Sequence, residues 1–136
     1  MKKGIIIVFT SLLCLAGCNK QAGFDERCAR EAKEQTLRLC PQKMAEGIML
    51  DSVSYQKQGR MFEYYYTMDD SLYSQQIIDQ AKGKLREGLR KGIVNSIELK
   101  KYKENNIAFR YVYIGKVSRK PVLEFTFTSE SYKDGK

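Results

Sequence analysis

Hydrophobic and polar residues recur along most of this chain with the spacings of regular secondary structure. Segments with the alternation and residue types of β-strands predict four strands, at residues 48–56, 60–68, 107–115 and 121–128. Spacings of three and four residues between apolar positions predict two helices, at residues 24–39 and 72–94. Each of these elements is therefore expected to have one buried face and one exposed face.

The same pattern assigns residues to faces. In the second strand Phe62, Tyr64 and Tyr66 share the face expected to be buried, while Glu63 and Tyr65 lie on the opposite face. On the long helix the packing face consists of Ile78, Ala81, Leu85, Gly88, Leu89 and Gly92. Because glycine has no side chain, we expect the two glycines on this face to let the helix approach a sheet closely.

The order of these elements predicts an α+β fold with an N-terminal helix and then two β-hairpins separated by a long helix (α-ββ-α-ββ). Runs of strands separated by a helix are typical of this class, so we expect an antiparallel sheet packed on the helix. Asp69 and Asp70 directly precede the long helix, and acidic side chains stabilise the start of a helix. The pair is therefore interpreted as the beginning of that helix.

The first eighteen residues have a different pattern. Lys2 and Lys3 precede an apolar segment of about a dozen residues, shorter than the ~20 that a membrane-spanning helix needs. A basic head, a short apolar core and small residues before the cleavage site are typical of a signal peptide. The segment ends in Leu15-Ala16-Gly17-Cys18, which resembles the lipobox of bacterial lipoproteins.

This resemblance implies that the signal peptide is removed before Cys18, and that Cys18 carries the lipid and becomes the mature N-terminus. An ordinary secretory signal peptide cut near Gly17 is the alternative interpretation. Asn19 replaces the aspartate that retains many lipoproteins in the inner membrane, so we expect the outer membrane, facing the periplasm. The chain as a whole resembles the small lipoproteins of the bacterial envelope. Its expected parts are a lipoprotein signal peptide (1–17), a lipidated tether (18–24), a single α+β domain (25–129) and a polar tail (130–136).

Charge indicates the kind of partner. The chain carries a formal charge of +8, and loss of Lys2 and Lys3 with the signal peptide leaves 22 basic against 16 acidic residues. A basic balance favours acidic partners, here the anionic headgroups of the lipid bilayer that holds Cys18, or another envelope protein; nucleic acid is not expected outside the cytoplasm. Three basic residues recur beside the packing face of the long helix: Lys82, Arg86 and Arg90. They are either a solvated flank of the helix or a contact for the anionic headgroups.

Composition excludes several kinds of catalytic site. The chain has no histidine, which removes Ser-His-Asp and Cys-His catalysis and most zinc sites. Its glycines have neither P-loop nor dinucleotide-binding spacing. We therefore expect a protein that is not an enzyme and that uses no metal and no other cofactor.

Two cysteines remain after Cys14 leaves with the signal peptide and Cys18 takes the lipid. Cys28 and Cys40 are an even pair in an exporting compartment, which permits a disulfide between them. A straight helix between them would hold them ~18 Å apart, whereas a disulfide needs Cα atoms within ~7 Å. Either the helix breaks or the two cysteines do not pair with each other in one chain.

The opposite face of the predicted strands supplies the remaining candidate surface. Tyrosine is enriched at interfaces, so Tyr65, if exposed, belongs to a partner surface. Arg110 falls on the same face and is expected to pair across strands with Glu63 or Glu124. Together these observations predict a non-enzymatic, membrane-anchored binding or structural module. A small proteinaceous inhibitor that docks on an envelope or foreign enzyme is the alternative.

Overall fold

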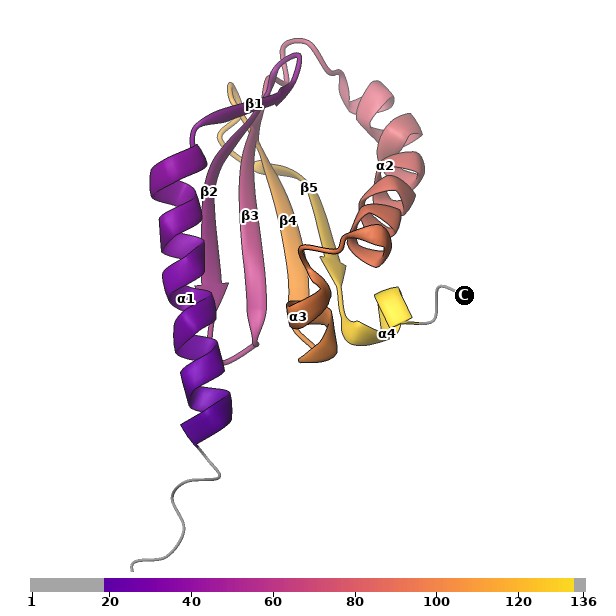
Figure 1. Cartoon of the computed structure of the whole chain (residues 1–136). Coiled ribbons are helices and arrows are strands. Elements are labelled where there is room, and N and C mark those ends of the chain that lie inside the picture. The colour runs from indigo at the N-terminus through magenta and orange to yellow at the C-terminus, as the bar shows by residue number, and fades with distance from the viewer. Residues whose placement is uncertain (1–18, 134–136) are drawn as a thin grey trace, which may run out of the picture.

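A computed structural model describes residues 19–133 of the chain (Figure 1). Its helices are α1 (Asn19–Leu39), α2 (Gln75–Asn95), α3 (Lys100–Glu104) and α4 (Ser129–Lys133). Its strands are β1 (Gln42–Ala45), β2 (Ile48–Gln56), β3 (Met61–Met68), β4 (Ala108–Gly115) and β5 (Pro121–Phe127). The predicted signal peptide and the lipidation site Cys18 lie outside the described residues.

The strands form one five-stranded sheet in the order β1-β2-β3-β4-β5. Strands β3 and β4 are parallel, and the other neighbours are antiparallel. The predicted arrangement of two β-hairpins in an antiparallel sheet is therefore wrong. The chain from β3 to β4 passes through α2 and α3, and this long crossover returns it to the end where β3 began, as parallel pairing requires. The prediction also missed β1, whose four residues are all exposed.

Helices α1 and α2 lie at opposite edges of the sheet (Figure 1). α1 packs along β2, whereas α2 contacts β5 and α4. The inner face of the sheet, which these helices cover, carries the aromatic residues. The most deeply buried large side chains of the core are Phe62, Phe109, Phe127, Ile93 and Ile107.

Parallel pairing of β3 and β4 places like residues side by side. Tyr64 is opposite Tyr111 and Tyr66 is opposite Tyr113. The rings of the first pair stack with centroids 5.0 Å apart, and those of the second pair with centroids 4.6 Å apart. Alternation put aromatic residues on one face of each strand, and the parallel register turned them into three stacked pairs, of which Phe62 and Phe109 are the third.

Helix α2 begins at Gln75, three residues later than predicted, because Ser74 caps it and accepts a hydrogen bond from the Ile77 N–H. The interpretation of Asp69 and Asp70 as the helix start is wrong. Asp69 instead accepts hydrogen bonds from Ser71. Asp70 accepts the N–H groups of Val117 and Ser118, and so ties the β3–α2 connection to the β4–β5 turn.

The predicted packing face of α2 is only partly buried. Ile78 and Ile93 are buried, Leu85 and Leu89 are half-buried, and Ala81, Gly88 and Gly92 are exposed. A Cβ atom added at either glycine would meet nothing within 4 Å. The expectation that these glycines allow a close approach is therefore wrong, although Leu85 and Leu89 on the same face pack against the core.

Both ends of the domain contain more helix than the sequence pattern indicated. α1 begins at Asn19, five residues before the predicted start, and its buried side chains are Cys28 and Ala32. Thr36 on the same stripe accepts the Val53 N–H and donates to the Val53 carbonyl, which attaches the helix to the edge of β2. At the other end α4 lies in the predicted polar tail, where buried Tyr132 donates to the Ile107 carbonyl.

Candidate functional site

The part of the inner sheet face between α1 and α2 is lined by four tyrosines, Tyr64, Tyr66, Tyr111 and Tyr113; we call this surface the trough. Burial raises the pKa of Tyr66 and Tyr111 above the ordinary value. None of the four hydroxyls forms a hydrogen bond within residues 19–133. In the same range no fully buried side-chain oxygen lacks a hydrogen-bond partner, so these hydroxyl oxygens are not fully enclosed. Tyr66, Tyr111 and Tyr113 are buried and Tyr64 is half-buried, so the rings form the apolar floor between the two helices.

Two hollows beside the helices differ in polarity. A hollow of about 360 Å³ runs along α2, and its lining is mostly apolar: Ala81, Lys84, Leu85, Gly88 and Leu89. A hollow of about 210 Å³ lies between α1 and α3, and its lining is mostly polar: Glu31, Glu34, Gln35, Arg38, Leu39 and Tyr102.

The outer sheet face carries the predicted arginine cluster. The two Arg110 nitrogens Nη1 and Nε lie 2.6 Å from Glu63 Oε2 and 2.8 Å from Glu124 Oε1. Tyr65 donates to Glu63 at 2.9 Å, and Glu63 is buried. The Arg110 guanidinium holds the pKa of Glu124 below its usual value. The predicted faces and the predicted pairing of Arg110 are confirmed, but these contacts already use the groups that a partner would bind. The role of Tyr65 and Arg110 as a partner surface stays a prediction.

The three basic residues of α2 that the sequence singled out differ in their contacts. Lys82 is exposed. The Arg86 guanidinium carbon lies 4.9 Å from the centroid of the Phe127 ring, a cation–π contact. Arg90 forms two hydrogen bonds with Glu87, at 2.7 and 3.0 Å. Contact of these three residues with anionic headgroups stays a prediction.

Both described cysteines are free thiols. Cys28 is buried inside α1, and Cys40 follows directly after the end of that helix. The helix is unbroken between them, which maintains the ~18 Å separation along its axis. Burial raises the pKa of Cys28 to about 11, so its thiol is protonated at neutral pH and is a poor nucleophile.

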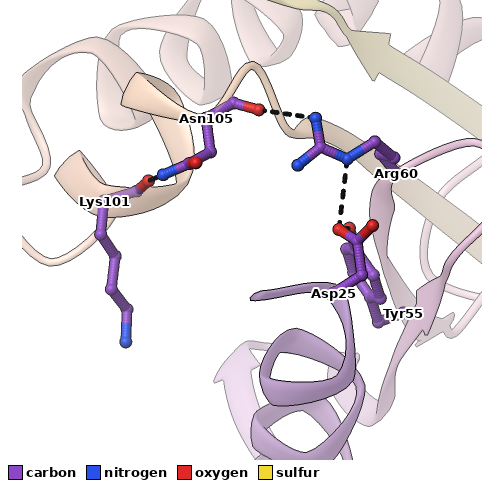
Figure 2. A network of polar contacts seen from close by, with 5 residues as sticks. All are labelled: Asp25, Tyr55, Arg60, Lys101 and Asn105. Carbon is purple, nitrogen blue, oxygen red and sulfur yellow. Dashed lines mark hydrogen bonds and ion pairs between the residues drawn. The ribbon is translucent and has the colours of Figure 1, made fainter. Parts of the chain in front are cut away.

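A polar network at the N-terminal end of α1 escaped the sequence pattern (Figure 2). Asp25 accepts hydrogen bonds from the Tyr55 hydroxyl at 2.8 Å and from Arg60 Nε at 3.2 Å. Arg60 Nη1 donates to the Asn105 carbonyl at 3.0 Å, and the Asn105 side chain donates to the Lys101 carbonyl at 2.7 Å. These residues are distant in sequence and follow no shared period, so no local signal identifies them.

Within residues 19–133 no group of three or more His, Cys, Asp or Glu side chains is placed to hold a metal ion. None of the helices in that range is long and apolar enough to cross a membrane.

Three solved structures share the fold. One is a protein from Pseudomonas aeruginosa described as secreted, with a TM-score of 0.70 and 14% identity over 83% of this chain and 96% of that one. The others are pilotins of type II secretion systems. EpsS from Vibrio vulnificus has a TM-score of 0.57 and 10% identity, over 85% of this chain and 96% of that one. AspS from Vibrio cholerae has a TM-score of 0.58 and 11% identity, over 85% and 98%.

At these identities the likeness shows a common fold and nothing finer. A family model described as "Domain of unknown function (DUF8479)" matches residues 23–124. This chain belongs to that family. No curated protein matches the sequence.

Proposed function

We propose that this protein is a lipid-anchored module of the cell envelope that binds a segment of another envelope protein in the trough and catalyses no reaction. Cys18 holds it on the outer membrane, facing the periplasm. The lipobox supports the anchor. The fold shared with two pilotins and a protein described as secreted supports the envelope and the binding role.

The observation that carries the binding role is the open apolar wall of α2. Half-buried Leu85 and Leu89 border a hollow that the protein's own side chains leave unfilled. An apolar hollow beside charged residues is the kind of surface that an apolar side chain of a partner can fill.

Charge narrows the partner further. Helix α2 carries five basic residues and two acidic ones, and Lys84 lines the hollow itself. The fitting partner is therefore an amphipathic segment with an apolar face for the leucines and acidic residues beside that face.

Filling the hollow tests this proposal. Gly88→Met places a flexible apolar side chain in it, and Gly83→Met is the matched control on the same helix, because Gly83 does not line the hollow. A Cβ atom at either position meets nothing within 4 Å, so both variants should fold. A photo-reactive residue at Lys84 in intact cells reports the contact with the partner.

The cross-link should persist in Gly83→Met and disappear in Gly88→Met, while circular dichroism shows both variants folded. An unchanged cross-link in Gly88→Met would refute the trough as the binding site. Mass spectrometry of the product identifies the partner, and an enzyme there would favour the inhibitor alternative.

A further inference from the structure

A third hollow, which we call the basal hollow, lies at the end of the domain where α1 begins. Its volume is about 370 Å³ and most of its exposed lining is polar. Three segments distant in sequence meet there: the first turns of α1, the β2–β3 turn and the end of α3. The lining residues are Lys20, Gln21, Phe24, Arg60, Glu104, Asn105 and Asn106.

Arg60 is fixed in this hollow before any ligand binds. Its backbone has a φ of 48°, and its guanidinium is held by Asp25 on α1 and by the Asn105 carbonyl (Figure 2). Those contacts use Nε and Nη1, and within residues 19–133 Nη2 has no hydrogen-bond partner. The hollow thus contains a positioned arginine with N–H groups to spare.

After the ion pairs around the basal hollow are counted, a net positive charge remains there. Asp25 is paired with Arg60, and Glu104 lies 3.9 Å from Lys100. Lys20 forms no ion pair within the described part of the chain. An anion of moderate size, with oxygens for an arginine and a lysine, fits this set of groups.

The position of the hollow identifies the source of that anion. α1 begins at Asn19, the residue after the predicted lipid attachment, and Lys20 and Gln21 in its first turn line the hollow. At ~1.5 Å per helical residue, these side chains lie within a few residues' rise of the acylated cysteine. The bilayer surface therefore presents its headgroups to the hollow at high local concentration.

We infer that the basal hollow binds the phosphate of an anionic phospholipid headgroup from the leaflet that holds the anchor. Lys20 and Arg60 Nη2 contact the phosphate oxygens, and the carboxamides of Asn105 and Asn106 border the headgroup. This inference rests on the proposed lipidation of Cys18. Its consequence is orientation: headgroup binding at a second point beside the lipid sets the domain upright, with the β1–β2 hairpin directed away from the membrane (Figure 1).

The test uses the mature lipidated protein in vesicles of phosphatidylcholine alone or with phosphatidylglycerol. Lys20→Gln removes a charge from the hollow. Lys57→Gln is the matched control, because Lys57 lies on the β2–β3 turn at the same end but does not line the hollow. Binding to the folded state alone raises the melting temperature. Phosphatidylglycerol should raise it by about 2–4 °C in the wild type and in Lys57→Gln, and not in Lys20→Gln.

An equal rise in Lys20→Gln, or no rise in the wild type, would overturn the inference. Glycerol phosphate added to phosphatidylcholine vesicles separates the two sources of phosphate. If millimolar glycerol phosphate reproduced the rise, the ligand would be a soluble phosphate and the assignment to the bilayer would be wrong. If the wild type were released from the vesicles, the lipid anchor itself would be refuted. If it stayed on the vesicles but its melting temperature did not rise, only the headgroup site would be refuted.

Discussion

Three glycines in α2 test how far this helix stands from the rest of the domain. A methyl group added at Gly83, Gly88 or Gly92 would meet no atom within 4 Å. Glycine inside a helix is less favourable than alanine by about 0.5–1 kcal/mol, because its backbone loses more conformational freedom on folding. We therefore predict that each Gly→Ala substitution raises the free energy of unfolding by about 0.5–1 kcal/mol, with no steric cost to offset it.

The three gains should be roughly additive, because each acts through its own residue, which gives about 1.5–3 kcal/mol for the triple variant. In a domain of this size 1 kcal/mol shifts the melting temperature by about 4 °C, so the triple variant should melt about 6–12 °C higher. Urea and thermal titrations of the domain without residues 1–18, followed by circular dichroism, measure both quantities.

Gly47→Ala is the control with the opposite sign. Gly47 has a φ of 70°, and an added Cβ would lie 2.9 Å from Leu72 Cδ1 and 3.2 Å from Asp69 Cβ. This substitution should lower the stability. If Gly88→Ala also lowered it while Gly83→Ala raised it, α2 would pack more closely than the structure has it. The hollow beside Leu85, and with it the proposed binding site, would then be wrong.

Three further predictions concern the core, the anchor and the response to pH. Phe125→Ala should lower the free energy of unfolding by about 3–5 kcal/mol, because the ring is buried. Glu124→Ala should lower it by under about 1 kcal/mol, because the ion pair of Glu124 is half-exposed. Comparable losses in urea melts of the two variants would contradict the assigned strand faces. Cys18→Ala should abolish incorporation of a fatty-acid probe and release the protein from the membrane fraction; a labelled variant would disprove lipidation at Cys18. Burial raises the pKa of Tyr66 and Tyr111 in the folded state. The free energy of unfolding should therefore be constant below pH ~10, the pKa of tyrosine in the unfolded chain, and fall above it by about 1.4 kcal/mol per pH unit for each such tyrosine. Alkaline titration of the unfolding free energy checks this, and a flat profile to pH ~12 would contradict it.

Local pattern determined which residues of each strand face the core. Alternation separated Phe62 and Tyr64 from Glu63, and it placed Arg110 on the face where it pairs with Glu63 and Glu124. The reason is geometric: successive side chains of a strand point to opposite faces, whatever the neighbouring strand is. The bounds of β2, residues 48–56, also follow from this short-range signal.

Tertiary structure alone decided how those strands pair and what they leave open. The parallel register of β3 and β4, which stacks Tyr64 on Tyr111, depends on where the crossover through α2 and α3 returns the chain. Asp70 was assigned to a helix start, but it bonds to a turn more than forty residues later, at Val117 and Ser118. The same holds for Arg60, whose partners come from α1 and α3. Periodicity reports the environment of a residue along its own element, and these contacts join elements that are distant in sequence. The basal hollow exists only where such elements meet, so no local pattern identifies it. The hollow along α2 differs, because Ala81, Leu85, Gly88 and Leu89 belong to the helix face that periodicity assigned; only the tertiary structure decided that this face stays partly open.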